Sequence, residues 1–266
     1  MKVCQSVVDR FSGFSEIYDQ FRPRTPRIIP ELLLKYSGSD SGATVVDLGC
    51  ATGLSTFVWA ELAEKVFGVD VNEELINMAR AKQADREVYS RTKFIQCAAN
   101  ETDIPAESAD IVTCSQSFHY MEPQSTLLEI DRILRKGGVF CAYDYELPPV
   151  GDWELELAFE QLLDGFVQLP RVQRPRQWPK AEHLARLCEC GYFRFVRGIL
   201  AHAAVEYDHK AMVGLLLSHG LTQSVLKWGH TQRGLGIDAF DRFAAKRLKG
   251  QAKPMLLSYK LRVAVK

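Results

Sequence analysis

A β-branched run followed by a glycine turn constrains the fold of this chain more than any other feature. Residues 44–55 have the sequence TVVDLGCATGLS, and residues 66–70 have the sequence VFGVD. The run at 44–48 predicts a buried strand, and the segment after it predicts a tight turn. Residues 54–64 predict a helix that returns along the sheet, and residues 66–70 predict a second strand that ends in an acid. The pattern indicates an α/β sheet with a binding turn at its strand ends.

The residue types in this unit suit a cofactor that carries a ribose and positive charge. Gly49 and Gly53 allow positive φ and bring bare backbone within van der Waals reach of a ligand. Asp70 ends its strand as an acceptor-only group, which suits the two vicinal hydroxyls of a ribose. Asp47 lies just before the turn and suits an ammonium or sulfonium better than phosphates. We therefore expect a nucleoside cofactor with a cationic tail.

Two other interpretations of the turn are open. A nicotinamide site would need three glycines in G-x-G-x-x-G, so that pyrophosphate can lie on a helix N-terminus. Here Ala51 occupies the second glycine position and Leu54 the third, which disfavours that cofactor. The other interpretation is a glycine turn that binds nothing, and the two spaced acids argue against it.

Further motifs follow along the chain, and together with the turn they resemble the class I S-adenosylmethionine-dependent methyltransferases. Residues 93–97 look like a third strand, and AANETDIP at 98–105 looks like the loop that holds the adenine in this family. SADIVTCSQSFHY at 108–120 is similar to the D-x-V-x-x-x-x-x-F-H-W segment of the small-molecule enzymes related to trans-aconitate methyltransferase. ILRKGGVF at 133–140 is similar to the family's L-K-P-G-G turn. YDQFRPRTP at 18–26 resembles its Y-x-x-x-R-P-x-Y-P stretch.

The chain departs from the family's pattern at several positions. Ala51 stands where glycine is usual, Asn100 where Glu is frequent, and Tyr120 where the family has Trp. Alanine tolerates most backbone regions that do not need positive φ, so we expect a weakened cofactor fit rather than its loss. The three departures leave open a second function: a binding or regulatory protein of the same fold that retains the cofactor without catalysis.

The resemblance implies S-adenosylmethionine as cofactor. It implies that Arg22 clamps the methionyl carboxylate with a two-pronged hydrogen bond while Tyr18 closes over the site. The alternative for Arg22 is a solvated side chain beside a proline turn. The expected cofactor-binding residues are Tyr18, Arg22, Asp47, Gly49, Cys50, Ala51, Gly53, Asp70, Val71, Ala98, Ala99, Ser115 and Gln116.

His119 is the candidate catalytic residue. It follows the fourth strand, where it can take a proton from an acceptor hydroxyl or orient the acceptor, or instead bond within its own loop and order the site. A base is optional, because positioning and water exclusion supply much of the rate of methyl transfer. The expected substrate residues are His119, Tyr120 and Tyr145. An aromatic wall around the sulfonium could be built from Tyr120, Tyr143, Tyr145, Trp153, Trp178 and Trp228.

Composition fits an ordinary enzyme that acts on small molecules. The 33 basic and 33 acidic residues balance, so no bulk attraction to nucleic acid or membrane is expected. No stretch reaches membrane-spanning length, and charges interrupt the apolar runs near the N-terminus, so no signal peptide is expected. Seven cysteines, Cys4 among them, show no disulfide pattern, which favours a reduced cytoplasmic setting. Cys188 and Cys190 lack a partner pair for zinc. The remaining histidines, His183, His202, His209, His219 and His230, show no metal spacing and are expected at the surface or in a lid.

The expected fold class is α/β: a Rossmann-like, seven-stranded, mostly parallel sheet with helices on both faces and a helical lid insertion. We expect residues 1–266 to form a single methyltransferase domain, with an N-terminal cap at 1–40 and the lid at 148–180. Residues 208–217 and 237–248 predict amphipathic helices, and residues 255–265 predict a last strand.

The expected function is methyl transfer from S-adenosylmethionine to a small molecule, with a carboxylate or hydroxyl oxygen favoured as acceptor. We expect no nucleic-acid partner, no membrane partner and no metal. The acceptor's identity and the oligomeric state do not follow from the sequence.

Overall fold

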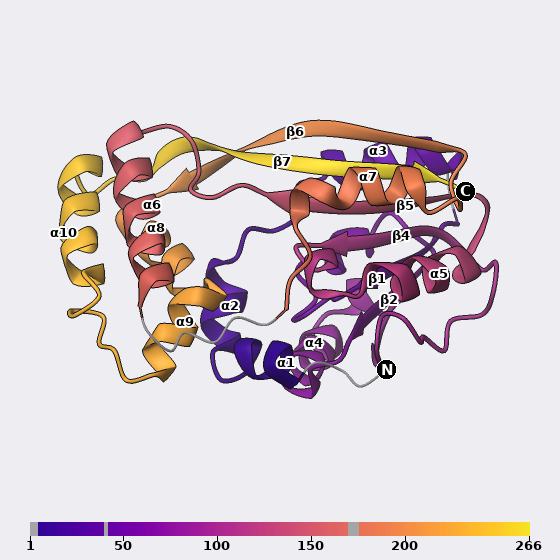
Figure 1. Ribbon diagram of the computed structural model, residues 1–266, viewed down its shortest axis with the longest axis horizontal. Coiled ribbons are helices and arrows are strands. Elements are labelled where there is room, and N and C mark those ends of the chain that lie inside the picture. The colour runs from indigo at the N-terminus through magenta and orange to yellow at the C-terminus, as the bar shows by residue number, and fades with distance from the viewer. Residues whose placement is uncertain (1–4, 40–41, 170–175) are drawn as a thin grey trace.

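The computed structural model describes residues 5–39, 42–169 and 176–266 and contains one seven-stranded sheet in the order β3-β2-β1-β4-β5-β7-β6 (Figure 1). Strands β1 to β5 pair in parallel, and β7 runs antiparallel to both of its neighbours. The expectation of seven mostly parallel strands is confirmed. The strands are β1 (Thr44–Leu48), β2 (Lys65–Asp70), β3 (Thr92–Gln96), β4 (Ala109–Ser115), β5 (Leu134–Tyr145), β6 (Phe195–Tyr207) and β7 (Lys253–Val265).

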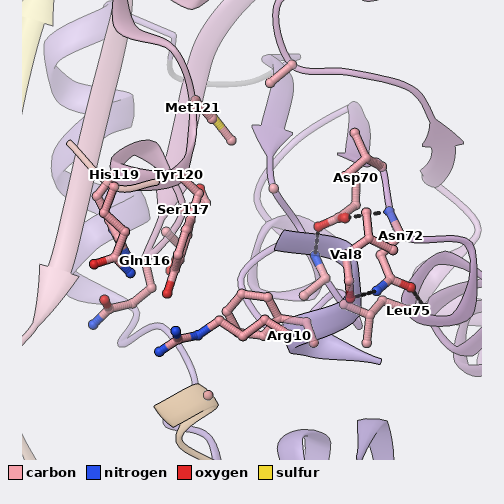
Figure 2. A pocket seen from close by; sticks show the side chains of 18 of the residues that line it. Val8, Arg10, Asp70, Asn72, Leu75, Gln116, Ser117, His119, Tyr120 and Met121 are labelled. Atoms are coloured by element: carbon pink, nitrogen blue, oxygen red, sulfur yellow. Dashed lines mark hydrogen bonds between the residues drawn. The ribbon is translucent and has the colours of Figure 1, made fainter. Parts of the chain in front are cut away.

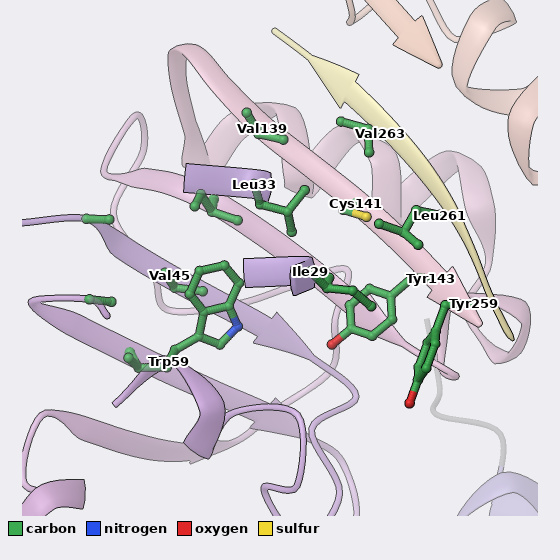
Figure 3. Packing of buried hydrophobic residues seen from close by; sticks show 14 of the residues in the cluster. Ile29, Leu33, Val45, Trp59, Val139, Cys141, Tyr143, Tyr259, Leu261 and Val263 are labelled. Atoms are coloured by element: carbon green, nitrogen blue, oxygen red, sulfur yellow. The ribbon is translucent and has the colours of Figure 1, made fainter. Parts of the chain in front are cut away.

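Helices cover both faces of this sheet, because successive strand residues point to opposite faces. On one face, Val45 of β1 packs with Ile29 and Leu33 of α3 (Ile28–Ser37), as Figure 3 shows. On the other face, Val46 packs with Ile130 of α5 (Pro123–Ile133). Each fully buried aliphatic side chain of this kind contributes about 1.5–3 kcal/mol relative to exposure. Both helix layers are therefore held by the same strands.

The remaining helices lie at the strand ends and along the sheet. Asn72 caps α4 (Glu73–Ala84) by accepting a hydrogen bond from the Leu75 N–H, which starts the helix directly after β2. Short 3-10 turns link several elements: η1 (Phe57–Trp59), η2 (Glu87–Tyr89), η3 (Phe118–Tyr120) and η4 (Lys180–Glu182). The other helices are α1 (Gln5–Phe11), α2 (Ser15–Phe21), α4 (Glu73–Ala84), α6 (Trp153–Gln168), α7 (His183–Glu189), α8 (His209–Leu217), α9 (Gly220–Lys227) and α10 (Ile237–Leu248).

The α-helix expected at 54–64 is absent. This segment forms tight turns around η1, with backbone hydrogen bonds such as Trp59 N–H to the Thr56 carbonyl. The hydroxyls of Ser55 and Thr56 both donate to Asp47, at 2.6 and 2.8 Å, and these bonds tie the start of the segment to β1. Local side-chain bonds of this kind compete with regular helix formation. The sequence pattern did not reveal them.

A second helical layer lies beyond the carboxyl ends of the parallel strands, at the left of Figure 1. It combines two insertions: α6 follows β5, and α8, α9 and α10 lie between β6 and β7. Their apolar faces share one buried cluster that includes Phe159, Leu215 and Phe240. The predicted helices at 208–217 and 237–248 are present as α8 and α10, whereas α9 was not anticipated. Part of the expected lid, residues 170–175, lies outside the described residues. So do residue 40 and residues 1–4 of the expected cap, which include Cys4.

None of the helices in the described ranges is long and apolar enough to cross a membrane.

The contact between α2 and α8 gives a test of how the helical layer is attached. A Cβ on Gly214 of α8 would lie 2.1 Å from Cδ1 of Phe21 of α2. Gly214→Ala should therefore lower the free energy of unfolding by ~1–3 kcal/mol, although alanine normally favours a helix. The matched control is Gly165→Ala in α6, where a Cβ meets nothing within 4 Å. That variant should gain up to ~1 kcal/mol. Chemical denaturation measures both, and equal gains would contradict the packing described.

Candidate functional site

A cavity of about 940 Å³ lies between the carboxyl ends of β1, β2 and β4 and the helices α1 and α9. Figure 2 shows Asp70 and Asn72 on one side, His119 and Tyr120 on the other, and Arg10 between them. Its volume is at the upper end of the range of about 300–1,000 Å³ for small-molecule sites. The predicted site residues that line it are Tyr18, Arg22, Gly49, Ala51, Asp70, Val71, Ala98, Ala99, Ser115, Gln116, His119 and Tyr120.

Asp70 is fixed at one end of the cavity by backbone groups. Its Oδ2 accepts from the Ala51 N–H at 2.9 Å and its Oδ1 from the Asn72 N–H at 2.9 Å. Burial raises the pKa of Asp70, and these two N–H donors partly offset that rise. Each carboxylate oxygen keeps a second lone-pair direction. Asp70 can therefore accept further hydrogen bonds from a ligand without losing its place.

The two glycines of the turn are required by the protein's own packing. Gly49 has φ 72°, and a Cβ there would lie 2.4 Å from Cβ of Ser117. Gly53 has φ 86°, and a Cβ there would lie 2.7 Å from the Phe57 ring. Gly49 lines the cavity and Gly53 does not. A side chain at either position would thus disturb the turn before it reached a ligand, so neither glycine offers a clean test of binding.

Ala51 departs from the expectation made for it. Its φ is 47°, in the left-handed region, whereas we expected a backbone that does not need positive φ. That conformation costs a non-glycine residue roughly 1–2 kcal/mol. The hydrogen bond from its N–H to Asp70 holds it there. The alanine therefore places a methyl group at the cavity wall and adds strain to the turn.

Asp47 and Cys50 lie behind the turn rather than in the cavity. Asp47 is fully buried and accepts hydrogen bonds from Ser55 and Thr56 and, at 2.8 Å, from Thr113 of β4. Burial raises its pKa, and the three hydroxyl donors oppose the rise. All three donors are protein hydroxyls, so Asp47 ties the turn to its own strand β1 and to β4. Cys50 borders only a separate pocket of about 20 Å³.

Gln116 and Lys180 connect the opposite end of the cavity to the sheet. The Gln116 backbone has φ 53°, and its side-chain amide donates to the Tyr145 carbonyl at 2.8 Å. Its Oε1 accepts from Lys180 Nζ at 2.7 Å. Lys180 Nζ also lies 2.9 Å from Oδ1 of Asp144, which is buried on β5. Lys180 and Asp144 were not anticipated, because no sequence spacing relates them.

His119 lies beside this pair and is almost completely buried. Its carbonyl accepts from the Trp178 N–H at 2.9 Å, which holds its loop. Its Nδ1 has no hydrogen-bond partner and lies 3.7 Å from Oδ1 of Asp144. Burial, together with the charge of Lys180, lowers the pKa of His119 to about 3. The imidazole is therefore neutral at physiological pH, and one of its two ring nitrogens carries a free lone pair.

Arg22 is a cation held by neutral groups. Its Nη1 donates to the Tyr145 hydroxyl at 2.5 Å and its Nε to the Ser218 carbonyl at 3.2 Å. The guanidinium carbon lies 5.2 Å from the centroid of the Tyr18 ring. No carboxylate in the described ranges pairs with it. Tyr145 itself borders the small pocket and not the large cavity.

The predicted aromatic wall is only partly present at the cavity. Tyr120 and Trp178 line it, and Phe11 of α1 packs edge-on against Tyr120 at 5.4 Å between centroids. Tyr143 lies in the core instead, and Trp153 and Trp228 are exposed at 68% and 49%. Both tryptophans belong to the outer surface of the helical layer. Phe11 of α1 therefore completes the wall, although the sequence did not predict this residue as part of it.

The expectation that the remaining histidines lie at the surface or in a lid is wrong for His183. This residue is fully buried, packs edge-on against Phe118 at 4.9 Å between centroids, and has no partner at either ring nitrogen. Burial lowers its pKa to about 4. No group of three metal-ligating side chains occurs among the described residues.

Comparison with known proteins agrees with this geometry. The profile of the methyltransferase domain family matches residues 46–142, which run from β1 through the turn and Asp70 into β5. Over residues 46–142 the chain is similar to class I methyltransferase domains. The cofactor of such domains is S-adenosylmethionine.

The relatives share the domain with low identity. A demethylmenaquinone methyltransferase of Lactococcus lactis is 29% identical over 72% of this chain and 77% of its own length. The "Probable S-adenosylmethionine-dependent methyltransferase CRG1" of Saccharomyces cerevisiae is 26% identical over 51% of this chain. The chain spans about half the length of some of these curated relatives. A "Putative Type II Methyltransferase" from Anaeromyxobacter dehalogenans superposes with a TM-score of 0.67 at 21% identity, covering 92% of this chain and 97% of that one. It shows that the whole fold is shared.

The buried neutral histidines predict how stability depends on pH. In the unfolded chain a histidine has a pKa of about 6.5, whereas folding lowers the pKa to about 3 for His119 and about 4 for His183. Between these limits the unfolded state binds more protons, so stability falls as the pH drops below about 6.5. Each histidine contributes up to ~1.4 kcal/mol per pH unit in that window.

Denaturant unfolding at pH 7, 6 and 5 measures this slope. His183→Leu should make the slope shallower, because one titrating group is removed. The control His230→Gln changes an exposed histidine and should leave the slope as it is. An unchanged slope in His183→Leu would show that His183 does not fold in its neutral form.

Proposed function

We propose that this chain transfers the methyl group of S-adenosylmethionine to an oxygen of a small-molecule acceptor. The observation that carries the proposal is one cavity with Asp70 at one end and His119 at the other, on the strand ends of a methyltransferase domain. When bound, the cofactor supplies an electrophilic methyl group on a sulfonium. The chain's own residues would bind it, exclude water and place the acceptor in line.

The proposed cofactor site extends along the strand ends. Asp70 would bind the ribose hydroxyls, and the backbone at Gly49 and Ala51 would border the tail of the cofactor. Val71, Ala98 and Ala99 would border the adenine. Ser115 and Gln116 would border the methionyl part. Arg22 has a second terminal nitrogen, Nη2, without a partner among the described residues, and we propose it for the methionyl carboxylate.

The proposed acceptor site lies at the His119 end. Tyr120 and Trp178 supply apolar walls, and Lys180 supplies positive charge. A carboxylate acceptor would be attracted by Lys180. A hydroxyl acceptor would instead give its proton to His119. Tyr145, expected as a substrate residue, would instead position Arg22 on the cofactor side, because its hydroxyl accepts a hydrogen bond from that guanidinium.

Ligand binding and a labelled-methyl assay test the proposal. Calorimetry with S-adenosylmethionine, S-adenosylhomocysteine and NAD should give binding of the first two only. Labelled S-adenosylmethionine should then transfer its methyl group to members of a panel of small carboxylic acids, phenols and alcohols. Binding without transfer to any of them would favour a cofactor-retaining protein without catalysis, as the strained Ala51 suggests. Binding of NAD alone would overturn the proposal.

Asp70 gives the first test of the cofactor site. Asp70→Asn should raise the Kd for S-adenosylmethionine about 5- to 150-fold, because hydrogen bonds to a charged acceptor are worth ~1–3 kcal/mol. The control Asp110→Asn removes a carboxylate that pairs with Arg135 away from the cavity, and it should leave the Kd unchanged. Circular dichroism checks that both variants fold. An unchanged Kd for S-adenosylmethionine in a folded Asp70→Asn variant would show that Asp70 does not bind the ribose.

His119 gives the test of the acceptor side. His119→Ala should keep S-adenosylmethionine affinity within a few-fold and lower turnover of an identified acceptor by about 10²-fold. A smaller loss of turnover with a raised KM for the acceptor would indicate an orienting role. Full activity would exclude His119 from the reaction.

A further inference from the structure

Asp144 is the only buried carboxylate among the described residues that contacts cationic side chains from two other elements, one of which, Lys180, lines the cavity. It lies on β5, where its Oδ2 accepts from Arg262 Nη1 of β7 at 2.6 Å. Its Oδ1 lies 2.9 Å from Lys180 Nζ and 3.7 Å from His119 Nδ1. These cations keep the pKa of Asp144 below its usual value against the opposing effect of burial, so the group is ionised. An ionised carboxylate accepts hydrogen bonds and donates none.

The His119 ring has two unlike nitrogens. Nδ1 is buried, lacks a partner and faces Asp144. Nε2 is left for the cavity, which His119 lines. A neutral imidazole carries one proton, and the group beside one nitrogen decides which nitrogen holds it. At 3.7 Å the Nδ1 to Oδ1 separation exceeds a hydrogen bond by only about half an ångström. Catalytic hydrogen bonds of this kind are commonly long before the substrate binds.

We propose that Asp144 is a positioning residue that holds His119 as its Nδ1–H tautomer, so that Nε2 accepts the proton of a hydroxyl acceptor. The inference rests on the proposed function and narrows it, because it selects between the two acceptor classes. An Nε2 lone pair receives a hydrogen bond from a hydroxyl and repels a carboxylate. The opposite tautomer would present an N–H and would suit a carboxylate.

The reaction balances with this tautomer. The hydroxyl oxygen forms a bond to the methyl carbon, and the carbon–sulfur bond breaks with its electron pair left on sulfur. The hydroxyl proton moves to Nε2, and the resulting imidazolium donates Nδ1–H to Asp144. Solvent takes the extra proton afterwards. Asp144 itself stays ionised and does not touch the acceptor.

Lys180 opposes this arrangement, because it holds the same Oδ1 that His119 needs. It also bonds Gln116, so it links Asp144 to the proposed methionyl side of the cavity. Its removal should free Oδ1 for His119 and raise the His119 pKa. The charged or titratable groups that act on His119 are Lys180 of η4, Asp144 of β5, His183 of α7, Arg10 of α1 and His219 before α9. The Tyr120 ring lies tilted against it at 4.1 Å between ring centroids.

Nitrogen NMR of the ¹⁵N-histidine-labelled chain tests the tautomer without any methyl transfer. The His119 signals are assigned by their loss in His119→Gln. In the wild type the Nδ1 atom should carry the proton, and in Asp144→Asn, whose amide can turn its NH₂ toward the ring, the proton should move to Nε2. The control Asp110→Asn, which breaks the pair with Arg135, should leave the His119 signals unchanged. A wild-type ring protonated at Nε2 would overturn the proposal.

The pH dependence separates a positioning role from a structural one. Lys180→Met should raise the His119 pKa from about 3 and move the acidic limb of kcat/KM to higher pH. Asp144→Asn should lower the pKa and reduce kcat for a hydroxyl acceptor about 10-fold or more. If Asp144 had a purely structural role, the acidic limb of kcat/KM would stay unchanged in both variants or would move in the same direction in both. Either result would overturn the proposal. If Asp144→Asn does not fold, the wild-type tautomer and Lys180→Met still decide.

Acceptor choice separates this inference from the proposed function. With a matched pair of an aryl alcohol and the corresponding aryl carboxylic acid, the alcohol should be methylated at a higher kcat/KM. Transfer to the carboxylic acid only, with normal S-adenosylmethionine binding, would keep the proposed function and overturn the role of Asp144. No S-adenosylmethionine binding at all would overturn the proposed function instead, while the NMR result on His119 would stand.

Discussion

The hydrogen bonds to the buried carboxylate of Asp47 determine the shape of the whole site. Three hydroxyls donate to it, from Ser55 and Thr56 after the turn and from Thr113 of the neighbouring strand. These bonds fix the turn against β1 and β4 at once. The turn then places the Ala51 N–H against Asp70, which sets one end of the cavity. A residue that the sequence suggested as a ligand contact therefore acts one layer below the ligand.

The sheet contains a second buried carboxylate that is satisfied in the opposite way. Asp47 is surrounded by neutral hydroxyls and its pKa is raised by burial, whereas Asp144 is surrounded by cations and its pKa is lowered. Loss of a partner is expensive in either case, because a buried charge without donors is strongly disfavoured. Neutral donors fix only the position of a carboxylate, whereas cations also set the electrostatic potential around it. The Asp70 end of the cavity is thus defined by geometry and the His119 end by charge.

How much of this site could be predicted from the sequence depends on how far apart the interacting residues lie along the chain. The strand, turn and acid of residues 44–70 were predictable because each signal is local, and α8 and α10 were predictable from their periodicity. The bonds from Lys180 to Gln116 and from Arg262 to Asp144 span 64 and 118 residues and leave no local pattern. The prediction of a helix at 54–64 was wrong for a related reason, because the hydroxyls of Ser55 and Thr56 donate to Asp47. The burial of His183 also depends on packing that no spacing records.

The cavity is built by segments that the sheet alone does not hold together. Asn72 of the sheet end donates to the Val8 carbonyl at 3.2 Å, and Lys227 of α9 donates to the Asp9 and Ser12 carbonyls at 2.7 and 2.6 Å. The first helix is therefore tied to the sheet on one side and to the helical layer on the other. The Asn72 side chain is buried and the Lys227 side chain is exposed, whereas the sheet is held throughout by buried apolar packing. The sheet is consequently the rigid part of the cavity, and the wall contributed by α1 and α9 is held less firmly.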